Sequence, residues 1–248
     1  MPIVDPKRAY ISQAVYLASN VIDKRVRYKQ ELAEGCFGSA ISSQSQQTNL
    51  SDDDDPAQPR IIFQAPHKQL LLTQIASQLV LSFETRDKSV AEQCEIITKN
   101  VKDVHSRIAK FKPQTELKEN ALVTTLSFPS DASREDLGSH IYNKLISLSP
   151  ISTVASTGVK IGFELKNKIY QNIEIDVYEK RRGEIKSPMT FIDINSFEIV
   201  ETGISVKLDF NNKLQSLEPG YSNPGPAELL ELFSQYIQND AFSILGFS

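Results

Sequence analysis

Residues 158–165 read GVKIGFEL, and residues 204–210 read ISVKLDF. In both stretches an apolar side chain recurs at every second residue, which is the period of a β-strand with one buried face. Residues 173–177 (IEIDV) repeat this pattern, a fourth apolar segment lies between residues 192 and 199, and short polar stretches join these runs. Such connections favour antiparallel hairpins, because a parallel crossover needs about a dozen residues or more. The sequence therefore predicts an antiparallel sheet whose apolar face is covered by other elements.

A fourth segment of this region changes phase along its length. Ile192 and Ile194 lie in one phase of the alternation, whereas Phe197 and Ile199 lie in the other, so we expect a bulge near residues 195–196. The alternation also predicts which side chains form the core of the sheet, namely Ile161, Phe163, Ile175, Val206 and Leu208.

The composition is that of a globular protein. The chain of 248 residues is 40% hydrophobic and 23% charged, which is enough apolar material for a sizeable core. A formal net charge of -4 gives no overall attraction to a phosphate backbone, so a nucleic-acid partner is disfavoured. There are two cysteines, and no apolar stretch approaches the roughly 18 residues of a membrane span. We therefore expect a cytoplasmic protein without a membrane segment.

Apolar residues recur at helical spacing near the N-terminus. Between residues 7 and 34 they lie three or four positions apart, and Gly35 follows as a candidate C-cap. This spacing predicts one long amphipathic helix, and the alternative is a helix that breaks near Asn20, because the β-branched residues that follow weaken helix formation. The helix must bury its stripe on the protein itself, on a second copy or on another protein. The stripe includes Ile11, Val15, Ala18 and Ile22.

Residues 41–58 are rich in serine, glutamine and aspartate and contain almost no apolar side chains. Such a composition predicts a disordered linker. We accordingly divide the chain into a helical arm (1–40), this linker and a single α+β domain (59–248). The acid run Asp52 to Asp55 is expected to be solvated, because adjacent carboxylates of an extended chain point apart and do not share a metal ion.

The remaining segments alternate between strand and helix patterns. The clearest helix covers residues 89–111, which open with the capping box Ser89-x-x-Glu92 and carry apolar residues at heptad spacing. Such a seam suits a helix that lies on a sheet as well as one that pairs with another helix. Residues 69–76 fit either a strand or a helix. We also expect strands at 60–65, 79–83 and 121–129, and helices at 133–148 and from Pro226 onwards.

Motifs that would identify an enzyme are scarce. The three histidines lie far apart, with no spacing typical of a zinc site. Cys94 and His105 lie on one predicted helix but about three turns apart, which is too far for shared chemistry. No phosphate-binding loop and no nucleophile elbow occurs. The sequence therefore predicts neither a metal site nor a bound cofactor.

One enzymatic pattern remains. Many metal-dependent nucleases hold an Asp and a Glu-x-Lys on adjacent antiparallel strands, where the carboxylates bind magnesium and the lysine assists the attacking water. Asp176 lies on a predicted strand, and Glu184-Ile185-Lys186 follows it. Charged residues on a solvated strand face also arise for solubility alone, and Glu-x-Lys recurs at residues 164–166. A magnesium-dependent nuclease that uses Asp176, Glu184 and Lys186 is thus the alternative function.

These patterns favour an α+β protein with an antiparallel sheet of about six or seven strands, covered on one face by long helices. The function that fits best is binding or assembly with another protein, without catalysis, through the stripe of Ile11, Val15, Ala18 and Ile22. Residues 7–34 and 89–111 both carry apolar stripes, so self-association as a homodimer is one form that this binding takes.

Overall fold

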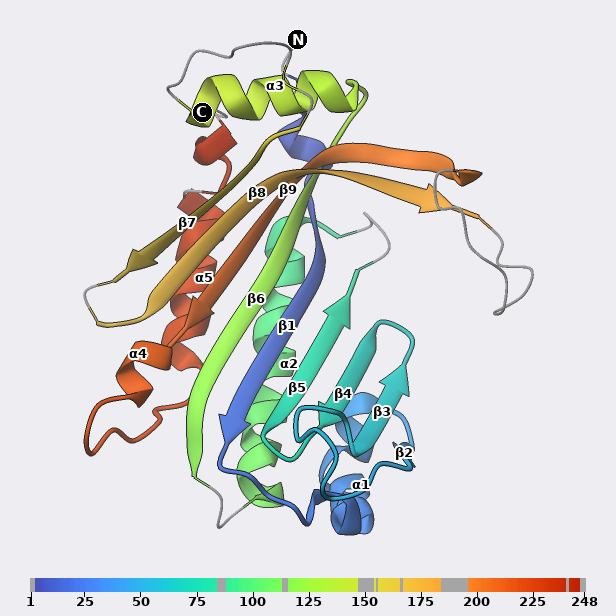
Figure 1. Ribbon diagram of the computed structural model, residues 1–248, viewed down its shortest axis with the longest axis vertical. Helices are drawn as coiled ribbons and strands as arrows, with labels where there is room; N and C mark the ends of the chain where they lie inside the picture. Colours follow the sequence, from blue (N-terminus) through green and yellow to red (C-terminus); the bar gives the residue numbers. More distant parts are fainter. Residues whose placement is uncertain are drawn as a thin grey trace.

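The computed structural model describes residues 3–83, 88–112, 116–146, 154, 156–165, 167–183, 196–239 and 241–245. Within these residues the main feature is a nine-stranded antiparallel sheet in the order β2-β3-β4-β5-β1-β6-β9-β8-β7 (Figure 1). The predicted α+β class and the antiparallel sheet are confirmed. The strand count exceeds the predicted six or seven. The reason is that β1 forms where the sequence predicts a helix, β2 forms within the predicted linker, and β4 forms in the segment that fits either a strand or a helix.

The chain builds the sheet in two halves. The first half contains β1 (Tyr10–Asn20), α1 (Gln30–Ile41), β2 (Ser45–Gln47), β3 (Ile61–Ala65), β4 (Lys68–Leu72), β5 (Ala76–Ser82) and α2 (Val90–Phe111). The second half contains β6 (Leu117–Ser130), α3 (Arg134–Leu145), β7 (Gly158–Glu164), β8 (Tyr170–Arg182), β9 (Glu198–Asn211), α4 (Lys213–Ser216) and α5 (Ala227–Asn239). Short 3-10 helices lie at Pro6–Arg8, Val26–Lys29 and Ser243–Leu245.

The two halves share one topology. Each begins with a central strand, continues through a helix to the outer part of the sheet, returns inward by two hairpins and ends in a helix on the sheet. From the centre outward the strands run β1-β5-β4-β3 in the first half and β6-β9-β8-β7 in the second, and the first half has one additional strand, β2, outside β3. Because β1 and β6 pair antiparallel, the halves are related by an approximate two-fold axis between them. This symmetry places α1 and α3 at opposite ends of the sheet (Figure 1).

The predicted N-terminal helix is wrong, because residues 10–20 form β1 at the centre of the sheet. β1 pairs with both β5 and β6, and Val15 lies opposite Val123. A central strand carries apolar residues on both faces, and such a continuous run contains helical spacings by coincidence. A helix forms further along as α1, which ends at Ile41, where Ser42 adopts the left-handed conformation with φ of 59°.

The predicted disordered linker is also wrong, because residues 41–58 have defined contacts. β2 lies within this segment and pairs with β3. The side-chain amide of Gln74 donates to the carbonyl of Asp52 at 2.9 Å, and the guanidinium of Arg60 donates to the carbonyl of Asp54 at 3.1 Å. Strand pairing and side-chain hydrogen bonds therefore hold this segment against the neighbouring part of the sheet.

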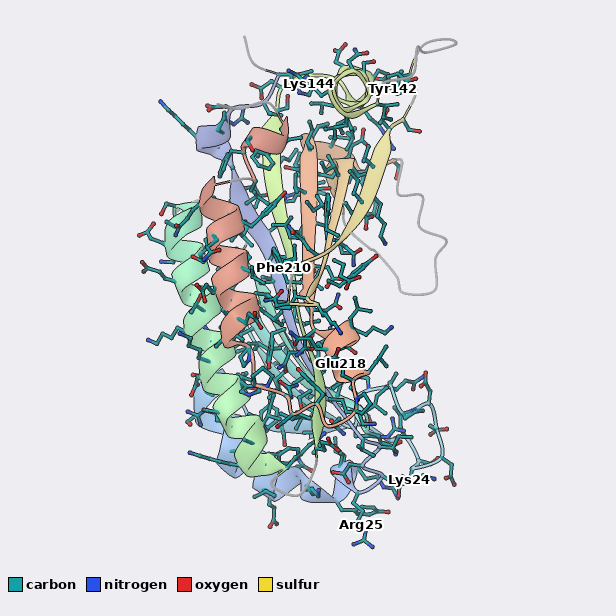
Figure 2. The ribbon with its side chains drawn as sticks, turned by 90° about the vertical axis from the view of Figure 1, so that its left-hand side faces the viewer. Lys24, Arg25, Tyr142, Lys144, Phe210 and Glu218 are labelled. Atoms are coloured by element: carbon teal, nitrogen blue, oxygen red, sulfur yellow. The ribbon has the colours of Figure 1, made fainter. Side chains whose placement is uncertain are left out.

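Helices α2 and α5 lie side by side on one face of the sheet (Figure 2). The predicted capping box of Ser89 and Glu92 is present at the start of α2. The heptad seam of α2 faces both the sheet and α1. The buried seam residues are Cys94, Ile97, Val101, Val104, Ile108 and Phe111.

We call the opposite face of the sheet, which α2 and α5 do not contact, the second face.

The predicted sheet core is correct for the inner strands and wrong for the outer one. Ile175 on β8 and Val206 and Leu208 on β9 are buried as expected. Ile161 and Phe163 have the predicted phase, yet their side chains remain 45% and 43% exposed. The reason is their position on β7, the last strand of the sheet, because α5 packs mainly on β9 and β6.

Candidate functional site

Of the three predicted nuclease residues, only Asp176 lies in the part of the chain that the structure describes. Asp176 is exposed on the second face, and its Oδ1 accepts a hydrogen bond from the amide of Val177 at 2.7 Å. Glu184 and Lys186 lie outside the described residues. Among the described residues, no group of three or more His, Cys, Asp or Glu side chains is placed to hold a metal ion. A single exposed carboxylate does not support a catalytic role.

Two basic residues near the end of β8, Lys180 and Arg181, lie close to acidic groups. The Lys180 ammonium lies 3.3 Å from Oε1 of Glu201, which also accepts hydrogen bonds from Tyr10 at 2.8 Å and Tyr178 at 2.7 Å. Arg181 meets Glu179 at 2.7 Å. Burial and the adjacent carboxylate both raise the pKa of Tyr178, which keeps its hydroxyl protonated. This cluster ties the ends of β1, β8 and β9 together.

Cys94 and His105 have separate roles, as their distance along α2 requires. Burial raises the pKa of the Cys94 thiol to about 12, so it is not a nucleophile at neutral pH. The Nδ1 atom of His105 lies 2.6 Å from the hydroxyl of Tyr16, which donates to Asn120 Oδ1 at 2.9 Å. Since Tyr16 has one proton to give, His105 Nδ1 must be the donor in the first of these bonds.

The same polar chain continues into the segment before α5. The side-chain amide of Asn120 donates to Asn223 Oδ1 at 2.6 Å, and the amide of Gly225 donates to the same oxygen at 2.8 Å. Burial lowers the pKa of His105, which favours the neutral ring. These bonds join β1, α2, β6 and the segment before α5, so we assign the network a structural role.

A groove of about 690 Å³ lies between α2 and α5. Its lining combines apolar side chains such as Val90 and Ile237 with Lys99 and Lys102 at the rim. The volume falls within the range of small-molecule pockets. The lining also holds Glu95, Thr98, Ser234 and Gln238, and nothing among the described residues specifies an occupant.

The four residues predicted to contact a partner do not share a surface. Ile11 and Ala18 are buried, with 0% and 1% of their side chains exposed. Val15 is half-buried on the second face, and Ile22 lies exposed in the turn after β1. They were grouped by helical spacing, and the strand separates them because successive residues point to opposite faces.

The feature best suited to binding is the outer side of β7, which we call the β7 edge (residues 158–164). The amide of Leu165 donates to the carbonyl of Ile169 at 2.8 Å, so this residue is directed at β8. In an antiparallel pair the backbone groups alternate in direction, so those of residues 159, 161 and 163 also face β8. The N–H and C=O groups of Gly158, Lys160, Gly162 and Glu164 therefore face outward.

The side chains of the β7 edge are arranged by the same alternation. Ile161 and Phe163 lie on the helix-covered side of the sheet, beyond the helices, and leave an exposed apolar strip. Lys160 and Glu164 lie on the second face, where Lys160 is 3.9 Å from Glu174. The alternating sequence of this segment predicted a strand, but its place at the margin depends on long-range pairing that the local pattern does not contain.

Comparison with known proteins found no family model, no curated protein and no solved structure that matches this chain. Within the described residues, no helix has the length and apolar character needed to cross a membrane.

Proposed function

We propose that this protein is a protein-binding module, without catalytic activity, which binds a partner by accepting an additional β-strand at the β7 edge. Strand addition joins an extended segment to an open sheet through backbone hydrogen bonds, while alternate side chains give specificity. The observation that carries this proposal is the row of outward backbone groups at residues 158, 160, 162 and 164, next to the exposed side chains of Ile161 and Phe163.

The internal symmetry of the fold supports this assignment. β3 is the counterpart of β7 in the first half, and its outer side is covered by β2 in antiparallel pairing, with Gln47 opposite Ile61. Within the described residues no strand covers the outer side of β7 (Figure 1). The fold thus already accommodates one antiparallel strand at the position that is open on β7.

The exposed apolar side chains add a second argument. Natural sheets protect an edge with proline, a bulge, a very short strand or charged side chains, and of these β7 has only the charged residues Lys160 and Glu164. β7 is seven residues long, contains no proline, and pairs with β8 without a register shift. An edge that is long, regular and apolar on one face is suited to pairing with another strand.

Proline substitution at an outward position tests strand addition. Lys160→Pro removes one outward amide donor and leaves the pairing with β8 in place, since proline is tolerated where its missing N–H faces away from the sheet. Lys160→Ala is the matched control, because it removes the same side chain and keeps the donor. Peptides selected from a displayed random library by the wild-type protein should bind Lys160→Ala normally and bind Lys160→Pro at least about tenfold more weakly.

Thermal melts of both variants establish that the fold is retained. Peptide binding that survives Lys160→Pro with unchanged affinity would place the binding surface elsewhere, with the groove between α2 and α5 as the next candidate.

A further inference from the structure

We infer that the strand added at the β7 edge is β7 of a second copy of this chain, paired about a two-fold axis that passes through Gly162. This inference rests on the proposed strand addition and names its partner. The two sheets would join edge to edge into one continuous antiparallel sheet.

The backbone limits the registers that two β7 strands can adopt. Only Gly158, Lys160, Gly162 and Glu164 direct their N–H and C=O groups outward, so each of them must face an outward residue of the second copy. Any register that places an outward residue opposite one directed at β8 is excluded. Centring the axis on Lys160, Ile161 or Gly162 meets this condition with at least three outward pairs.

The charges select one of these registers. Centred on Lys160, the axis would bring the two Lys160 side chains face to face, and like charges directly opposite destabilise a strand pair. Centred on Ile161, it would place Lys160 opposite Gly162 and leave its charge unmatched. Centred on Gly162, it places Lys160 of each copy opposite Glu164 of the other, which gives two opposite-charge pairs on the second face.

The same register also matches the apolar side chains. Ile161 of each copy lies opposite Phe163 of the other, on the helix-covered side of the joined sheet. These two residues are 45% and 43% exposed, and a cross-strand pair of an aromatic and a β-branched residue is among the favourable ones. Gly162 lies opposite itself on the axis. Three outward pairs, each exchanging two backbone bonds, would give about six hydrogen bonds between the copies.

The opposite edge of the sheet shows why assembly stops at two copies. That edge is β2, which has three residues, Ser45–Gln47, and no apolar side chain. Such a short, polar strand is one of the ways in which proteins prevent further edge pairing. Pairing of β7 with β7 uses one edge from each copy and closes with two-fold symmetry, the commonest arrangement of soluble oligomers.

Charge reversal tests both the partner and the register. In size-exclusion chromatography with light scattering, the full-length chain should reach twice 27.8 kDa as its concentration rises through the micromolar range. Lys160→Glu and Glu164→Lys should each weaken this self-association by about tenfold or more, because each places two like-charge pairs at the interface. An equimolar mixture of the two variants should recover wild-type affinity, because a β7 strand with two glutamates then lies opposite a β7 strand with two lysines.

Lys207→Glu is the control, since it makes the same charge change on the second face two strands away from the β7 edge, on β9. It should leave the dimer unchanged. A wild-type chain that stays monomeric at several hundred micromolar overturns self-pairing, while the peptide experiment with Lys160→Pro still decides strand addition. A wild-type dimer that Lys160→Pro dissociates, but whose charge variants do not recover on mixing, overturns the Gly162 register alone.

Discussion

Arg60 illustrates how one residue can order a segment whose composition indicates disorder. Its side chain is fully buried, and its guanidinium donates to the carbonyls of Gln58 at 2.9 Å, Asp54 at 3.1 Å and Asp55 at 3.3 Å. A buried guanidinium is tolerated only when acceptors surround it. The segment therefore supplies the carbonyls that Arg60 needs, and Arg60 in turn holds the segment in place.

The four aspartates next to Arg60 also have individual partners. Asp52 pairs with Arg27 at 2.9 Å and Asp53 with Lys24 at 3.1 Å. The other two accept backbone hydrogen bonds from Ser51 and Ala57. Composition averages over such contacts. Arg27 and Lys24 lie 25 and 29 positions before their partners, which is too far for a local sequence pattern to show the pairing. The order of this segment was therefore not predictable from its composition.

Arg60→Met should release this segment. Methionine preserves much of the buried volume and removes the donors, so the carbonyls of residues 54–58 lose their partner while the strands remain packed. In limited proteolysis analysed by mass spectrometry, we expect cleavage within residues 48–58 to become several times faster than in the wild type. Arg25→Met is the control, because Arg25 is exposed at the end of the molecule (Figure 2). Equal cleavage rates in both variants would show that Arg60 does not hold the segment.

Lys112 gives a prediction for the dependence of stability on pH. Its ammonium is buried and donates to Asn20 Oδ1 at 2.8 Å, and burial lowers the pKa of this group from 10.5 to about 8. Between these two values the unfolded chain binds more protons than the folded chain, so the free energy of unfolding rises as the pH increases from about 8 to 10.5. At neutral pH the charged form costs on the order of 3 kcal/mol.

Lys112→Met should remove this slope. Denaturant unfolding of the wild type should show a gain in stability across the alkaline range, while the variant should give a flatter profile and be at least as stable at pH 7. The opposite slope, with stability falling between pH 8 and 10 in the wild type alone, would contradict the assignment of Lys112 as a buried, desolvated group.

At the scale of elements, the predictions that succeeded rest on signals confined to one segment. The start of α2 was predicted because Ser89 and Glu92 satisfy each other's backbone donors within four residues. β1 was missed because a strand in the middle of a sheet has no polar face to mark its period, and its partners β5 and β6 lie far along the chain. The β7 edge was missed for a related reason, since the local pattern of an outer strand resembles that of an inner one.

Close packing between elements is tested at Gly203 on β9. A Cβ atom at this position would lie 2.3 Å from the carbonyl oxygen of Phe128 and 2.9 Å from the ring of Tyr178, so Gly203→Ala should destabilise the protein by about 1–3 kcal/mol. The matched control is Gly35→Ala inside α1, where a Cβ meets nothing within 4 Å and should stabilise the helix by about 0.5–1 kcal/mol. Calorimetric melts should therefore shift in opposite directions. Equal shifts would contradict the close approach of β6 and β8 to β9.

At the scale of the whole molecule, the approximate two-fold symmetry explains why the fold class was predictable and the architecture was not. The repeat is one of topology, and no fixed sequence period accompanies it. The order of strands is set by which edges meet, and that information is distributed over contacts between distant segments. The alternation within 158–165 or 204–210 therefore gave the type of sheet but not the positions of its strands.

The symmetry predicts that the two halves of the sheet depend on each other for folding. β1 and β6 have 11 and 14 residues and pair along most of their length, so separating the halves would expose two long edges at once. Residues 1–113 and 114–248, coexpressed as separate chains with a tag on one, should therefore purify together in equimolar amounts, and each alone should aggregate. The cut falls between α2, which ends at Phe111, and β6, which begins at Leu117, so it divides neither element and should be tolerated. If either half alone gives a cooperative melt and does not bind the other, the halves are independent domains, and the pairing of β1 with β6 is not what holds the sheet together.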